Sequence, residues 1–96
     1  MTIILLPAAE EDLEQVYNYY RLIRPELADE MMDEFRRGVE QILKHPRGWQ
    51  LLGRRHRAYR LNRFPYRIVY YEDSNSGDIV ISNFTHLHRR PGTPRS

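Results

Sequence analysis

The first half of the chain carries apolar residues at the spacing of α-helices. A short apolar run, Thr2–Leu6, stands before a proline and predicts a buried strand. After it, apolar residues recur every three or four positions and predict amphipathic helices over Ala8–Leu22 and Pro25–Lys44. The Arg24-Pro25 step separates the two helices, and His45-Pro46 ends the second. Two helices joined so closely are expected to pack as an antiparallel hairpin whose shared apolar side covers a sheet.

The second half changes to a period of two, which is typical of β-strands. Between the two patterns, Arg47–Gly53 has no clear period, and we expect a loop anchored by Trp49 and Leu51. Alternation over Arg57–Arg63, and again over Tyr66–Tyr71 after a Phe-Pro step, predicts two neighbouring strands. The residues expected to face the helices are Tyr59, Leu61, Tyr66, Ile68 and Tyr70. If they do, Arg60 and Arg67 emerge together on the opposite face.

A last strand completes the predicted sheet. The turn residues of Asp73–Asp78 connect it to the preceding strand, and it runs over Ile79–Thr85 with a bulge near Ser82, because Phe84 breaks the apolar alternation. The tail after it is basic and irregular. The sequence therefore predicts an α+β fold: a strand, an antiparallel two-helix hairpin, then a three-stranded antiparallel meander.

Length and composition limit the possible classes of protein. The chain has 96 residues, 41% of them hydrophobic, so we expect one domain over residues 1–96. The absence of cysteine excludes disulfides and thiolate metal sites. The first residues have neither the basic leader of a signal peptide nor an apolar run long enough to span a membrane. We therefore expect a cytoplasmic protein without a membrane partner.

Charge is segregated along the chain. Residues 1–44 contain ten acidic and five basic residues, a net charge of −5, whereas residues 45–96 contain three acidic and ten basic residues, a net charge of +7. No Asp or Glu lies between Gln41 and Tyr71, so sequence neighbours cannot neutralise the arginines there. This asymmetry favours an acidic partner, either nucleic acid or an acidic protein segment. A solvated basic surface is the alternative.

Several short motifs together resemble the RelE/ParE toxin superfamily, and most closely its ParE-like members. They are Ala9-x-x-Asp12-Leu13, Pro46, Phe64-Pro65-Tyr66-Arg67-Ile68-x-Tyr70 and His86-x-x-Arg89-x-Pro91. The resemblance covers nearly the whole chain. It implies a small bacterial toxin of a type II toxin–antitoxin system, bound and neutralised by a cognate antitoxin in a hetero-oligomer.

The superfamily has two classes of target, which imply different chemistry. RelE-like members cut messenger RNA on the ribosome, and ParE-like members poison DNA gyrase. Metal-independent RNA cleavage needs a base, a proton donor and cations around the phosphate. By the resemblance, Arg60 and Arg67 stand at two of the basic positions, but Ala58 stands where a lysine is expected, and no tyrosine follows Tyr71.

Two histidines keep the nuclease hypothesis open, because an imidazole can replace either proton-transfer group. If the chain is a nuclease, the candidate residues are Arg60, Arg67, His86, His88 and Arg89. Alternatively, His86 ends the last strand and bonds to backbone or to a neighbouring acid. No residue spacing indicates a metal or cofactor site, so none is expected.

We favour the ParE-like interpretation, in which the arginines bind a partner rather than a reacting phosphate. The candidate partner-binding residues are Arg57, Arg60, Arg67, Arg89 and Arg90. The expected partners are a cognate antitoxin and DNA gyrase. A RelE-like endonuclease acting on ribosome-bound messenger RNA is the alternative, and an inactive member of the superfamily is a third.

Overall fold

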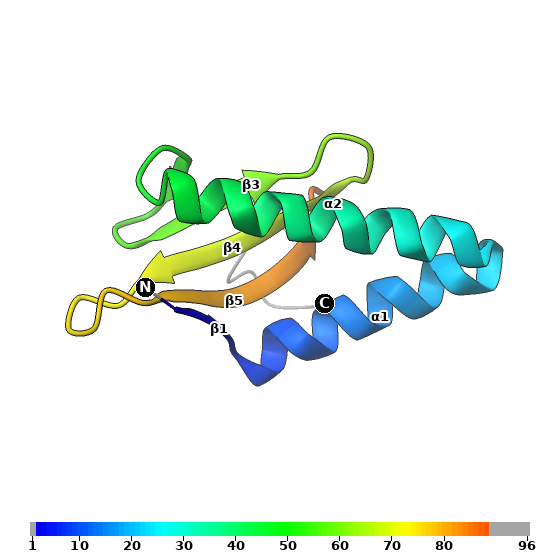
Figure 1. The fold of residues 1–96 in the computed structure, drawn as a ribbon, viewed down its shortest axis with the longest axis horizontal. Coiled ribbons are helices and arrows are strands. Elements are labelled where there is room, and N and C mark those ends of the chain that lie inside the picture. The colour runs from blue at the N-terminus through cyan, green and yellow to red at the C-terminus, as the bar shows by residue number, and fades with distance from the viewer. Residues whose placement is uncertain (1, 89–96) are drawn as a thin grey trace.

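The predicted succession of a strand, two helices and further strands is present in the computed structural model, which describes residues 2–88 (Figure 1). The elements are β1 (Ile3–Leu5), α1 (Pro7–Ile23), α2 (Pro25–Lys44), β2 (Gln50–Leu52), β3 (His56–Arg60), β4 (Tyr66–Glu72) and β5 (Ile79–His86). Both helices begin with a proline in their first turn, where its missing N–H costs nothing. They lie on one face of the sheet, and their junction projects beyond it (Figure 1).

The sheet has five strands in the order β1-β5-β4-β3-β2. The predicted meander is its antiparallel part, β3-β4-β5, and β1 pairs in parallel with β5, so the sheet is mixed. Two details of the prediction are wrong. β2 lies within the segment predicted as a loop, and β1 is an edge strand on which the Ile4 side chain is 41% exposed. β2 is too short to show a clear alternation of apolar and polar residues, and it forms by pairing with β3. β1 is a strand as predicted, but it pairs with β5 at the edge of the sheet, which leaves Ile4 exposed.

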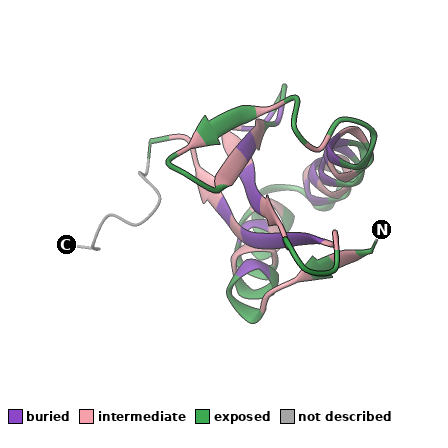
Figure 2. Cartoon of the chain, turned by 90° about the vertical axis from the view of Figure 1, so that its left-hand side faces the viewer, coloured by how far each residue is buried: buried purple, intermediate pink, exposed green. Residues whose placement is uncertain are grey.

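The core lies between the helix hairpin and the central strands. Figure 2 shows the buried positions on the central strands and on the helix sides turned toward them. Leu61, Ile68 and Tyr70 are buried as predicted, and Tyr59 packs against the same cluster. Gly38 lets α2 approach the sheet closely, because a Cβ at this position would lie 2.9 Å from the Tyr59 ring and 3.0 Å from Ile68.

One predicted loop anchor is confirmed and the other is wrong. The Trp49 indole donates a hydrogen bond to the Gln41 carbonyl (3.3 Å) and packs edge-on against Tyr59. Leu51 is instead 51% exposed, because it lies on the short edge strand β2 beyond the reach of the helices. Trp49 therefore fixes the connection between α2 and β2.

The predicted bulge in β5 is confirmed. The register between β4 and β5 shifts between Val69 and Tyr70, which pair with Asn83 and Ile81 and leave Ser82 between them. The Ser82 hydroxyl donates to the Val69 carbonyl at 3.3 Å. Because of this extra residue, Phe84 faces the helices, where it packs against Phe35.

Candidate functional site

The predicted arginine pair lies on the sheet face turned away from the helices. Arg60 on β3 stands directly opposite Arg67 on β4, and residues directly opposite each other project from the same face. The neighbouring pair Tyr59 and Ile68 faces α2, so alternation turns the arginines the other way. We call the surface that carries Ala58, Arg60, Arg67 and Val69 the distal face.

The two arginines of the distal face differ in exposure. Arg60 is exposed at the end of β3, and Arg67 is half-buried in the middle of the sheet. Within residues 2–88, Arg60 takes part in no ion pair. Like charges directly opposite on a sheet destabilise it, so an anion bound beside this pair would offset their repulsion. Guanidinium groups bind carboxylates and phosphates through paired hydrogen bonds, so this pair is a candidate site for such an anion.

Arg57 does not belong to the distal face, which corrects the predicted grouping with Arg60 and Arg67. It stands opposite Tyr70, whose side chain is buried beneath the helices, and its guanidinium donates to the Trp49 carbonyl at 2.8 Å. The physical reason is parity, because residues three apart on a regular strand point to opposite faces.

A second basic cluster, which the sequence interpretation missed, surrounds Arg57. A pocket of about 350 Å³ is lined by four arginines, one glutamate and two tyrosines, among other residues. The charged and aromatic members are Arg47, Arg54, Arg55, Arg57, Glu72, Tyr70 and Tyr71. Arg47 pairs with Glu72 at 3.3 Å, and the Arg55 guanidinium lies 4.0 Å from the centre of the Tyr71 ring. The consecutive arginines Arg54 and Arg55 were the signal in the sequence for a basic cluster. Arg47 joins them only because β2 and β3 pair, which the sequence did not predict.

Tyr70 borders this pocket as a neutral group. Its hydroxyl donates to the Pro46 carbonyl at 2.8 Å, and burial raises its pKa to about 12. The nearby Arg57 lowers the pKa and so opposes part of the shift. Tyr70 therefore acts as a structural donor at neutral pH.

His86 lies apart from the arginine pair. It stands opposite Tyr66, which stacks on the helix-facing Phe84, so His86 projects on the helix side of the sheet. Its ring packs edge-on against Tyr66 (5.2 Å between centroids), and its Nδ1 accepts a hydrogen bond from the His88 backbone N–H (3.1 Å).

The other candidate residues lie toward the C-terminus. His88 is exposed in the turn after β5, and its ring lies 5.0 Å from that of His86. Arg89 and Arg90 lie outside the described residues. Among residues 2–88, no group of three or more histidine or carboxylate side chains is placed to hold a metal ion. No helix in this range is long and apolar enough to cross a membrane.

A comparison with family profiles identifies the family of the chain. Residues 3–91 match the profile described as ParE toxin of the type II toxin–antitoxin system parDE. The chain belongs to the ParE toxin family. This confirms the resemblance given by the motifs. A search of curated protein sequences found no significant match.

A solved structure shows the same fold. The chain is similar to a chain of the chromosomal ParDE toxin–antitoxin system from P. aeruginosa, with a TM-score of 0.70 and 20% sequence identity. The alignment covers 92% of this chain and 97% of that chain. The fold of this chain is therefore shared with a chain of that system, while the roles of Arg60, Arg67 and His86 stay predictions.

Proposed function

We propose that this ParE-family toxin inhibits DNA gyrase and that a cognate antitoxin neutralises it in the cytoplasm. Family membership supports the toxin class. The observation that favours gyrase over messenger RNA is the separation of His86 from the Arg60–Arg67 pair, since the two lie on opposite faces of the sheet. RNA cleavage requires a proton-transfer group beside the cations that hold the phosphate.

Induced expression in bacteria distinguishes the two targets. A gyrase poison leaves broken DNA, so we expect filamentous cells, DNA breaks and an SOS response while translation continues at first. A rapid stop in translation with cleaved messenger RNA and intact DNA would overturn the gyrase proposal and favour the RelE-like alternative.

The antitoxin segment is proposed to place acidic side chains against Arg60 and Arg67 on the distal face. The charge asymmetry of the chain favours an acidic partner, and the distal face is where two arginines stand directly opposite each other on neighbouring strands. Ion pairs desolvated at such an interface are costly to break, since removing one partner leaves the other charge buried and unpaired.

Reversing both charges tests this placement. We expect Arg60→Glu with Arg67→Glu to weaken antitoxin binding at least about a hundredfold, consistent with about 2–5 kcal/mol for a truncated buried charge pair, and to flatten its salt dependence. Arg37→Glu, an exposed arginine on α2, is the matched control. Calorimetry at two salt concentrations measures both quantities. Unchanged affinity and salt dependence in the double variant would show that the antitoxin lies elsewhere.

A further inference from the structure

The second basic cluster, formed by Arg47, Arg54, Arg55 and Arg57, has no part in the proposed function. It surrounds a pocket of about 350 Å³ at the end of the sheet where β3 begins and β4 ends. Glu72 is the only acid among the described residues that line this pocket, so the lining carries four positive charges and one negative charge, a net charge of +3. A pocket with this charge suits a multiply charged anion or a chain of anionic groups.

Two of these guanidinium groups are held in place by the protein itself. Arg57 donates a hydrogen bond to the Trp49 carbonyl at 2.8 Å, and the Arg55 guanidinium lies 4.0 Å from the centre of the Tyr71 ring. A guanidinium has five N–H donors, so Arg57 keeps further donors for a ligand. Cations fixed in this way lose little conformational freedom when an anion binds, which favours binding.

The other two arginines of the cluster reach into solvent. The Arg47 side chain pairs with Glu72 at 3.3 Å but is 79% exposed, and Arg54 is exposed as well. Within residues 2–88, no carboxylate forms an ion pair with Arg54 or Arg55. An anionic polymer that binds to exposed cations of this kind releases the small ions around its own charges, and this release drives association.

The second basic cluster is separate from the arginine pair of the distal face. Arg54 and Arg55 lie directly before β3, whereas Arg60 is the last residue of that strand. At about 3.3 Å per residue, the two ends of β3 are about 13 Å apart. Substitutions at one site therefore leave the side chains of the other in place.

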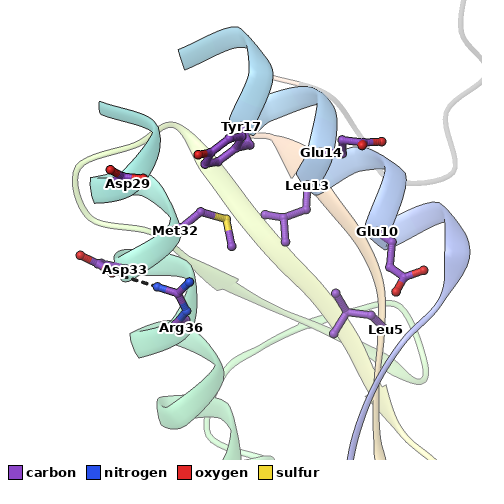
Figure 3. A pocket seen from close by; sticks show the side chains of 9 residues that line it. All are labelled: Leu5, Glu10, Leu13, Glu14, Tyr17, Asp29, Met32, Asp33 and Arg36. Atoms are coloured by element: carbon purple, nitrogen blue, oxygen red, sulfur yellow. Dashed lines mark hydrogen bonds and ion pairs between the residues drawn. The ribbon is translucent and has the colours of Figure 1, made fainter. Parts of the chain in front are cut away.

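The helix layer carries the opposite charge. Figure 3 shows the groove between the two helices, which is apolar inside and acidic at its edge. The carboxylates around it are Glu10, Glu14, Asp29 and Asp33, and Arg36, the only base among the described residues that line it, pairs with Asp33 at 2.9 Å. Like charges repel, so a polyanion is directed away from the helices and toward the sheet layer.

We propose that the second basic cluster binds phosphate groups of a nucleic-acid backbone. Guanidinium groups hold phosphates through paired hydrogen bonds, and a nucleic acid presents several phosphates in a row. An acidic protein segment is the competing occupant. Half of the ten residues that line the pocket are charged, and protein–DNA interfaces are more polar and more positively charged than interfaces between proteins. The inference goes beyond the proposed function, because this contact requires neither gyrase nor an antitoxin.

Fluorescence anisotropy of a short labelled DNA duplex with the purified full chain tests the proposal. We expect binding that weakens as salt rises, because each neutralised phosphate releases bound ions. Arg54→Gln with Arg55→Gln should weaken binding at least about tenfold at low salt and make the logarithmic salt dependence shallower by about two. Circular dichroism of each variant verifies the fold. No binding by the unmodified chain, or unchanged affinity and salt dependence in the double variant, overturns the proposal.

The control variant loses the same charge elsewhere on the molecule. Arg21→Gln with Arg37→Gln removes two exposed arginines from the helix layer and should bind the duplex almost as tightly as the unmodified chain. Equal losses in the two double variants would show that only the net charge of the chain matters, which also overturns the proposal. Labelled polyglutamate, a model of an acidic protein segment, should bind more weakly than the duplex. Equal or tighter binding of polyglutamate would assign the cluster to a protein partner instead.

The Tyr71 ring is a positioning group for Arg55 in this proposal. Tyr71→Leu should weaken binding of the duplex about two- to fivefold, which corresponds to an exposed contact between a cation and an aromatic ring. Tyr71→Phe keeps the ring and should bind as the unmodified chain does. Equal weakening in the two variants would contradict this role of the ring.

Discussion

At the scale of single residues, one buried carboxylate of α2 holds the loop that follows Arg60. Glu34 of α2 is only 6% exposed. Its carboxylate accepts hydrogen bonds from the backbone N–H groups of Asn62 and Arg63, the latter at 3.1 Å. These groups lie just beyond Arg60, so Glu34 fixes the loop between β3 and β4 and with it the position of Arg60.

Removing the Glu34 carboxylate should therefore destabilise the fold. We expect Glu34→Ala to lower the free energy of unfolding by about 1–3 kcal/mol, because it leaves backbone donors without their acceptor. Glu34→Gln keeps one acceptor oxygen and should cost less. Glu40→Ala, at an exposed position of the same helix, should change stability by less than about 0.5 kcal/mol. Urea denaturation measures all three. Equal losses for Glu34→Ala and Glu40→Ala would contradict this role.

Two tyrosines, the partly buried Tyr20 and the buried Tyr70, should make the fold sensitive to alkaline pH. Burial is the main cause that raises the pKa values of Tyr20 and Tyr70 to about 12, from an ordinary value of 10.0. Between these values the unfolded chain loses tyrosine protons that the folded chain retains, so stability falls as pH rises from 10 toward 12. Urea denaturation along this pH range should show a progressive loss, and Tyr70→Phe should flatten it. A constant free energy of unfolding across the range would refute the prediction.

At the scale of elements, α2 is the helix whose packing brings β3 and β4 into register with the core. Six of its residues are buried, and Gly38 lies where the helix passes the Tyr59–Ile68 pair. A side chain there would separate the helix from the sheet. The close contact, rather than any backbone requirement, explains a glycine in the interior of a long helix.

Gly38→Ala should reverse the usual effect of this substitution. In an exposed helix interior, alanine is favoured over glycine by about 0.8–1.0 kcal/mol. Here the added methyl group meets Tyr59 at 2.9 Å and Ile68 at 3.0 Å, and we expect a net destabilisation of about 1–3 kcal/mol. Thermal and urea denaturation measure the change. A more stable variant would show that the aromatic ring yields without cost.

The elements that the sequence predicted are those long enough to show a full period of the apolar pattern. Both helices, β4 and the β5 bulge follow from apolar spacing and turn residues, and the distal placement of Arg60 and Arg67 follows from alternation. Alternation also separates Arg57 from Arg60, a consequence that the grouping by charge overlooked. The side of the sheet on which His86 lies depends on its register with Tyr66 across the bulge, which no local pattern contains. The bonds from Glu34 to Asn62 and Arg63 join residues too distant in sequence for any periodicity to predict.

At the scale of the whole molecule, the acidic and basic halves of the sequence form different layers, the helices and the sheet. Residues 1–44, with a net charge of −5, supply both helices and the edge strand β1, whereas the basic remainder supplies the other four strands of the sheet. The helix layer therefore presents an acidic groove, and the sheet presents the Arg60–Arg67 pair. The acidic antitoxin segment is proposed to bind to the sheet layer, where this pair lies.

The most direct test of the central claim is DNA supercoiling by purified gyrase in the presence of the purified chain, beside a cell-free translation reaction containing the same amount of protein. We expect supercoiling to be inhibited and cleaved DNA to accumulate, with the effect removed by the cognate antitoxin and translation unaffected. Unimpaired supercoiling together with arrested translation and cleaved messenger RNA would contradict the account.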